Sequence, residues 1–86
     1  MKKKIAILGS TGSIGQSTLE VIRKDKKNFN IILLSANNNY KKLVEQAKQF
    51  KVNNVLIKNH KFYLKVKNSL KRTKTKSPLF SFLIKK

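Results

Sequence analysis

The stretch IAILGSTGSIG, residues 5–15, decides the fold that the sequence predicts. It begins with a short apolar run, Ile5–Leu8, of the kind that forms a strand buried on both faces of a sheet. All three glycines of the sequence, Gly9, Gly12 and Gly15, follow at regular intervals. Because glycine accepts positive φ angles and lets other groups approach the backbone, this confinement indicates a segment whose backbone geometry matters.

The rest of the chain alternates between helical and strand patterns. Apolar residues at helical spacing predict amphipathic helices that run through Ile14, Thr18, Val21 and Ile22, through Leu43, Ala47 and Phe50, and through Phe62, Val66 and Leu70. Short apolar runs at residues 30–35 and 55–57 predict two more buried strands. The order β-α-β-α-β-α is typical of a parallel sheet with right-handed crossovers. We therefore expect an α/β fold, a partial Rossmann-like doubly wound parallel sheet.

The glycine segment has the spacing G-x-x-G-x-x-G between a predicted strand and a predicted helix. In a dinucleotide-binding turn, Gly9 would let the chain leave the strand sharply, Gly12 would admit a pyrophosphate, and Gly15 would let the helix pack closely. Amides near Gly12, Ser13 and Ile14 would point toward phosphate oxygens at the amino end of the helix. No lysine follows the last glycine, which excludes a P-loop. The predicted cofactor-binding residues of this segment are Gly9, Thr11, Gly12, Ser13, Ile14 and Gly15.

The end of the second predicted strand indicates which dinucleotide binds. An NAD site usually has Asp or Glu there to hold the ribose hydroxyls. This sequence has Asn37, Asn38 and Asn39 instead, followed closely by Lys41 and Lys42. No carboxylate would repel a 2′-phosphate, and the side-chain amides can donate to it, so we predict NADPH as the cofactor. The asparagine run also suits a loop and a helix cap, and both roles can hold together.

The composition excludes several classes of enzyme. The chain has 86 residues, with 21 Lys and Arg against 3 Asp and Glu, and a formal net charge of +18. It has no Cys and one His, and its acids are Glu20, Asp25 and Glu45. A hard divalent cation needs several oxygen ligands, and glycoside hydrolysis needs paired carboxylates. We therefore predict no metal site and no catalytic residues in this chain.

No apolar run approaches the length of a membrane span. Lys2, Lys3 and Lys4 resemble the start of a signal peptide, but the apolar stretch after them is too short for its core. We expect a cytoplasmic protein with no membrane partner.

The residues of the glycine segment and of several later stretches closely resemble one known family, 1-deoxy-D-xylulose 5-phosphate reductoisomerase. The resemblance rests on residues 4–15, 17–22, 34–39 and 43–50, and it covers about residues 1–70. It implies a bacterial enzyme that rearranges this sugar phosphate and reduces the product, with NADPH, to 2-C-methyl-D-erythritol 4-phosphate for isoprenoid biosynthesis. By position, residues 11–14 would hold the pyrophosphate, and residues 37–39 the ribose and its 2′-phosphate.

The resemblance also implies what this chain lacks. The family's metal-binding carboxylates, substrate-phosphate site and dimer surface lie further along a much longer chain. We therefore expect a divalent metal (Mg or Mn), the sugar phosphate substrate and homodimer formation only in the full-length form, and no reductoisomerase activity from these 86 residues alone. Many relatives have Gly and Lys where this chain has Asn37 and Asn38.

The predicted domain organisation has two parts. Residues 1–70 form the N-terminal part of an NADPH-binding Rossmann domain. Residues 71–86 form a basic linker and an apolar tail, with a candidate fourth strand at residues 79–84. Three or four parallel strands with a bare apolar edge make half of a doubly wound sheet, so we predict a fragment, and the tail is either native or out-of-frame sequence.

Two other functions stay open. One is a fragment of another NADP-dependent dehydrogenase with the same turn, such as the aspartate-semialdehyde type. The other is a small basic protein that binds nucleic acid or an anionic surface. The basic residues are spread along the chain and do not form one stripe. Lys, Asn and Ile have A- and T-rich codons, so a genomic base bias would raise the content of all three together. We therefore do not expect nucleic acid as the partner.

Overall fold

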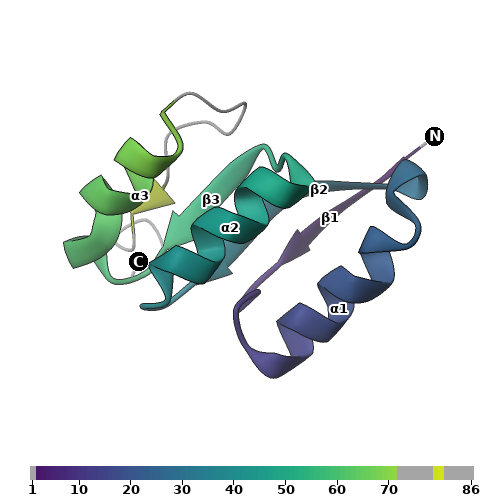
Figure 1. Cartoon of the computed structure of the whole chain (residues 1–86), viewed down its shortest axis with the longest axis horizontal. Coiled ribbons are helices and arrows are strands. Elements are labelled where there is room, and N and C mark those ends of the chain that lie inside the picture. The colour runs from purple at the N-terminus through teal and green to yellow at the C-terminus, as the bar shows by residue number, and fades with distance from the viewer. Residues whose placement is uncertain (1, 72–78, 81–86) are drawn as a thin grey trace.

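The computed structural model describes residues 2–71 and 79–80, which form a parallel sheet with helices (Figure 1). The strands are β1 (Lys3–Ile7), β2 (Phe29–Ala36), β3 (Asn54–Ile57) and β4 (Leu79–Phe80). The α-helices are α1 (Ser13–Arg23), α2 (Tyr40–Phe50) and α3 (Tyr63–Ser69), and short 3₁₀ helices are η1 (Lys26–Asn28) and η2 (His60–Phe62). None of the helices within this part combines the length and hydropathy needed to cross a bilayer.

The sheet has the strand order β1-β2-β3-β4, and each neighbouring pair is parallel. Helices α1 and α2 lie on the same face of the sheet in Figure 1, as consecutive right-handed crossovers require. The predicted α/β class and parallel sheet are confirmed. The predicted fourth strand is confirmed at Leu79–Phe80, and residues 81–84 lie outside the described part.

One hydrophobic core fills the space between the sheet and its helices. Its fully buried members come from β2, α2, β3, α3 and the connection between α2 and β3, and include Leu34, Leu43, Val55, Ile57 and Val66. The predicted apolar faces of α2 and α3 are confirmed, because Ala47 and Leu70 also lie in this core and Phe50 and Phe62 pack against it.

The predicted core face of α1 is wrong by one residue. The buried positions are Gly15, Leu19 and Ile22, whereas Ile14 and Val21 are 84% and 66% exposed. Thr18 is exposed as well, so only Ile22 of the predicted row faces the core. Glycine carries no apolar side chain, so the pattern of apolar residues missed the position that sets the rotation of this helix.

The prediction that β1 is buried on both faces is also wrong. Ile7 is buried, but Ala6 is exposed and Leu8, which follows the strand, is 72% exposed. Among the described residues β1 is an edge strand, paired with β2 alone. Side chains alternate between the two faces of a strand, and α1 and α2 lie on the same face of the sheet, so Ala6 and Leu8 point to the face that these helices leave open (Figure 1).

We expect Leu34→Ala to lower the free energy of unfolding by about 2–5 kcal/mol, because it opens a cavity in the central strand β2. A domain of this size has little stability to lose, so urea unfolding followed by circular dichroism will show a large shift of the midpoint. The matched control is Leu64→Ala on α3, where Leu64 is 64% exposed and the expected change is within about 0.5 kcal/mol. Equal effects of the two changes would contradict this account of the core.

Candidate functional site

The residues predicted to bind a cofactor lie at one edge of the sheet, at the lower left of Figure 1. All carboxyl ends of a parallel sheet meet at one edge, so the loops after β1, β2 and β3 lie together. Backbone hydrogen bonds hold them there. The Ser10 amide donates to the Ser35 carbonyl of β2 at 2.8 Å, and the Asn59 amide of the loop after β3 donates to the Asn37 carbonyl of the loop after β2 at 3.0 Å. Tertiary structure therefore brings the glycine segment and the asparagine run to one place.

The glycine loop leaves the amino end of α1 open. Gly9 turns the chain off β1 with a φ of +69°, and the Gly12 amide closes the turn on the Gly9 carbonyl at 3.1 Å. Gly12 is the N-cap of α1, and within the described residues no side chain caps this end of the helix. The backbone N–H groups of Ser13 and Ile14, in the first turn, are therefore left to donate to a ligand. They lie at the positive end of the helix dipole, and this arrangement binds phosphate.

A hollow of about 650 Å³ lies beside this loop. The predicted residues that line it are Gly9, Gly12, Ser13, Ile14 and Gly15. Exposed Leu8 contributes an apolar wall beside them. Thr11 belongs to the same loop but lies outside this lining, and its carbonyl accepts a hydrogen bond from Gln16 Nε2 at 2.8 Å.

Gly15 makes the closest approach in the loop. A Cβ at this position would lie 2.4 Å from the Gly9 carbonyl oxygen and 2.6 Å from Ser10 Cα. The predicted need for glycine is confirmed, and the contact is between α1 and its own loop. At Gly12 the nearest atom to a Cβ is the Gly9 oxygen at 3.4 Å, which is ordinary contact. The protein therefore leaves the space at Gly12 open.

The asparagine run combines capping with free donors. Asn39 Oδ1 accepts from the Lys42 amide at 3.2 Å and caps α2. Asn38 Oδ1 accepts from Asn59 Nδ2 at 2.7 Å. With both oxygens occupied, the Nδ2 groups of the exposed Asn38 and Asn39 remain available as donors. The predicted capping role is confirmed for Asn39, and Asn37 is exposed beside it.

Two residues that support the site were not predicted. Ser35 Oγ accepts from the Gly9 amide at 3.0 Å and holds the start of the glycine loop. Asn59 holds Asn38 through its side-chain amide. Each is a polar residue at or just after the carboxyl end of an apolar strand. That position in a parallel sheet is where ligand sites form, so it could have indicated both residues from the sequence.

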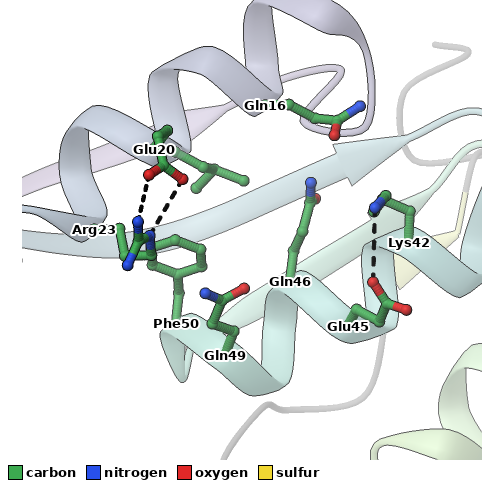
Figure 2. Close-up of a pocket in the computed structure, with 9 residues that line it drawn as sticks. Gln16, Glu20, Arg23, Lys42, Glu45, Gln46, Gln49 and Phe50 are labelled. Atoms are coloured by element: carbon green, nitrogen blue, oxygen red, sulfur yellow. Dashed lines mark hydrogen bonds and ion pairs between the residues drawn. The ribbon is translucent and has the colours of Figure 1, made fainter.

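The acidic side chains lie away from this edge. A second hollow, of about 140 Å³, separates α1 from α2, and the ion pairs Glu20–Arg23 and Lys42–Glu45 border it (Figure 2). The hydrogen bond from Arg23 lowers the pKa of the Glu20 carboxyl. Asp25 lies apart, at the start of η1. In residues 2–71 no three His, Cys, Asp or Glu side chains gather, so the residues present do not fit a divalent metal.

Known proteins resemble this chain in sequence. The family model described as 1-deoxy-D-xylulose 5-phosphate reductoisomerase matches residues 5–81. The protein of that name from Pelagibacter ubique is 53% identical over 74 residues, which are 86% of this chain and 19% of that protein. The one from Phocaeicola vulgatus is 49% identical over 70 residues, 81% of this chain and 18% of that protein. This chain therefore spans about a fifth of the length of these relatives.

Solved structures show the same fold. The reductoisomerase from Zymomonas mobilis in complex with NADPH superposes with a TM-score of 0.88 at 31% identity, over 91% of this chain and 21% of that one. A reductoisomerase in complex with NADPH, fosmidomycin and magnesium gives a TM-score of 0.83 at 29% identity, over 91% of this chain and 19% of that one. These superpositions show that the chain has the Rossmann-like α/β fold of the corresponding part of these enzymes.

We expect Gly15→Ala to lower the free energy of unfolding by about 1–3 kcal/mol, because the new methyl group overlaps the glycine loop and forces α1 outward. The matched control is Gly12→Ala, whose methyl group meets no atom closer than 3.4 Å and whose cost, a weaker N-cap, is below about 1 kcal/mol. Urea unfolding measures both. A Gly15→Ala protein as stable as Gly12→Ala would contradict the close approach.

Proposed function

The chain belongs to the 1-deoxy-D-xylulose 5-phosphate reductoisomerase family, and from this membership we propose that it is the NADPH-binding part of such an enzyme. The observation that carries the proposal is the uncapped amino end of α1, presented by a loop whose glycines leave room for a ligand. The NADPH complex of the Zymomonas mobilis relative supports the same ligand.

In the proposed complex, the glycine loop binds the cofactor pyrophosphate. The amides near Gly12, Ser13 and Ile14 donate to its oxygens, and Thr11 and Ser13 add hydroxyl groups. Gly9 and Gly15 bind no phosphate themselves under this proposal. They give the loop its shape, through the positive φ of Gly9 and the close approach at Gly15.

The adenosine ribose and its 2′-phosphate bind at residues 37–39 in this proposal. Asn59 and the capping bond occupy the side-chain oxygens of Asn38 and Asn39, so their Nδ2 groups donate to the 2′-phosphate. Lys41 and Lys42 at the start of α2 add positive charge. With no carboxylate in the run, the site favours NADPH over NADH.

We propose that residues 1–70 form this cofactor-binding part and that residues 71–86 form a basic linker and an apolar tail, of which Leu79–Phe80 join the sheet as β4. The longer protein would convert 1-deoxy-D-xylulose 5-phosphate to 2-C-methyl-D-erythritol 4-phosphate, as a homodimer in the bacterial cytoplasm. The relatives' name and the related complex with NADPH, fosmidomycin and magnesium support this reaction. The acids in the described part of this chain do not fit a metal, so its own role is to bind and orient NADPH.

Gly12→Val tests the proposed function. Valine accepts the extended backbone of Gly12, with φ −78° and ψ 174°, so the chain should stay folded while the side chain fills the space for the pyrophosphate. We expect the dissociation constant for NADPH, from fluorescence titration, to rise by about a hundredfold or more, as for the loss of several charge-assisted hydrogen bonds.

The matched control for Gly12→Val is Asn53→Val, an exposed position before β3 at the opposite edge of the sheet. Unchanged NADPH binding by a folded Gly12→Val chain would contradict the site. If the chain bound any polyanion as tightly as NADPH, and its affinity fell steeply as the salt concentration rose, the result would favour the nucleic-acid alternative.

Asn38→Asp tests the preference for NADPH. The new carboxylate still accepts from Asn59 Nδ2, so the loop keeps its shape, but it repels the 2′-phosphate. We expect the dissociation constant for NADPH to rise by about tenfold or more and that for NADH to change by less than about threefold. Asn53→Asp adds the same charge at the far edge and should leave the ratio unchanged. An unaltered ratio in Asn38→Asp would place the 2′-phosphate elsewhere.

A further inference from the structure

We propose that Gln46 is a positioning residue for the dinucleotide, holding the glycine loop against helix α2 through Ser10. The two side chains form the buried polar pair of the described core, with Ser10 0% and Gln46 6% exposed. They are separated by 36 residues in the sequence and meet only through the fold. This inference rests on the proposed function, because the positioned ligand is NADPH.

The contact between them is reciprocal. Ser10 Oγ donates to Gln46 Oε1 at 2.7 Å, and Gln46 Nε2 donates to the Ser10 carbonyl at 2.9 Å. One side-chain amide therefore pairs with both a hydroxyl group and a backbone carbonyl of the same residue. Burial leaves little water to replace either bond, so the loss of the amide would leave the Ser10 carbonyl without its Gln46 donor and the Ser10 hydroxyl with the longer bond to the Ser35 carbonyl, at 3.3 Å.

Ser10 is also tied to β2. Its amide donates to the Ser35 carbonyl at 2.8 Å, and the adjacent Gly9 amide donates to Ser35 Oγ at 3.0 Å. The loop is thus attached to the strand at one side and, through Gln46, to α2 at the other. Two attachments to different elements fix the orientation of the loop, which one attachment alone would not.

The attachment to α2 matters because the same helix begins at the second part of the proposed cofactor site. Asn39 is its N-cap, and Gln46 lies on the buried face of the same 11-residue helix. A rigid helix thereby connects the residues that hold the 2′-phosphate with the loop that holds the pyrophosphate. NADPH spans both parts, so its affinity depends on the relative placement that Gln46 sets.

The neighbouring glutamines differ from Gln46 in their surroundings. Figure 2 shows Gln46 pointing from α2 toward the α1 side of the hollow, with Gln49 one turn further along α2. Gln49 lines the same hollow but is exposed. Gln16 reaches the Thr11 carbonyl from within α1 and so does not connect the loop to another element.

Gln46→Met tests the proposal in the full chain, because methionine keeps the length and volume but removes both hydrogen bonds. We expect the dissociation constant for NADPH to rise by about tenfold, the equivalent of two modest hydrogen bonds. The dissociation constant for adenosine 2′-monophosphate, which reaches only the residues at the start of α2, should change by less than about twofold. A simple loss of folded protein would weaken both ligands equally.

Gln49→Met is the matched control and should leave both dissociation constants unchanged. Amide hydrogen exchange without ligand gives an independent readout, in which Gln46→Met should speed exchange in residues 9–15 and leave β3 protected. Equal binding of NADPH by Gln46→Met and the unsubstituted chain, or equal weakening of both ligands, would overturn the positioning role alone. No NADPH binding by the unsubstituted chain would overturn the proposed function and this role with it.

Discussion

The close approach of Gly15 to the glycine loop is the constraint on which the rest of the structure depends. Any Cβ at position 15 would lie 2.4 Å from the Gly9 carbonyl oxygen, so only glycine fits. This contact sets the rotation of α1, and with it the burial of Leu19 and Ile22 and the exposure of Ile14. It also keeps the first turn of α1 directly beside the end of β1, where its amides face a ligand.

The site combines polar groups from segments that are distant in the sequence. Parallel strands deliver three loops to one edge, and a small set of hydrogen bonds then orders them. Ser35 holds the glycine loop from β2, Asn59 holds Asn38 from the end of β3, and Gln46 holds Ser10 from α2. Each bond occupies a group that would otherwise be free to turn, so the proposed donors to a ligand are those in the first turn of α1, the Thr11 hydroxyl group and the side-chain amides of the asparagine run.

The distribution of charge agrees with the binding of an anionic cofactor. Glu20 and Glu45 each pair with a basic residue on their own helix, Arg23 on α1 and Lys42 on α2, and Asp25 lies at η1. The proposed cofactor edge has no acidic residue in the loops after β1, β2 and β3, while Lys41, Lys42 and Lys58 lie on or beside it. A phosphate entering this edge therefore meets partial positive charge from the helix and full positive charge from lysine.

The sequence by itself determined the order of strands and helices, the glycine turn and the asparagine run, because hydrophobic periodicity and glycine placement are local signals. It placed the core faces of α2 and α3 correctly, and it failed at α1 and β1. Only the tertiary structure decided that β1 is an edge strand among the described residues and that Gly15 faces inward, since both depend on what packs alongside. The roles of Ser35, Gln46 and Asn59 were likewise decided by tertiary structure, because their partners lie 21 to 36 residues away in the chain.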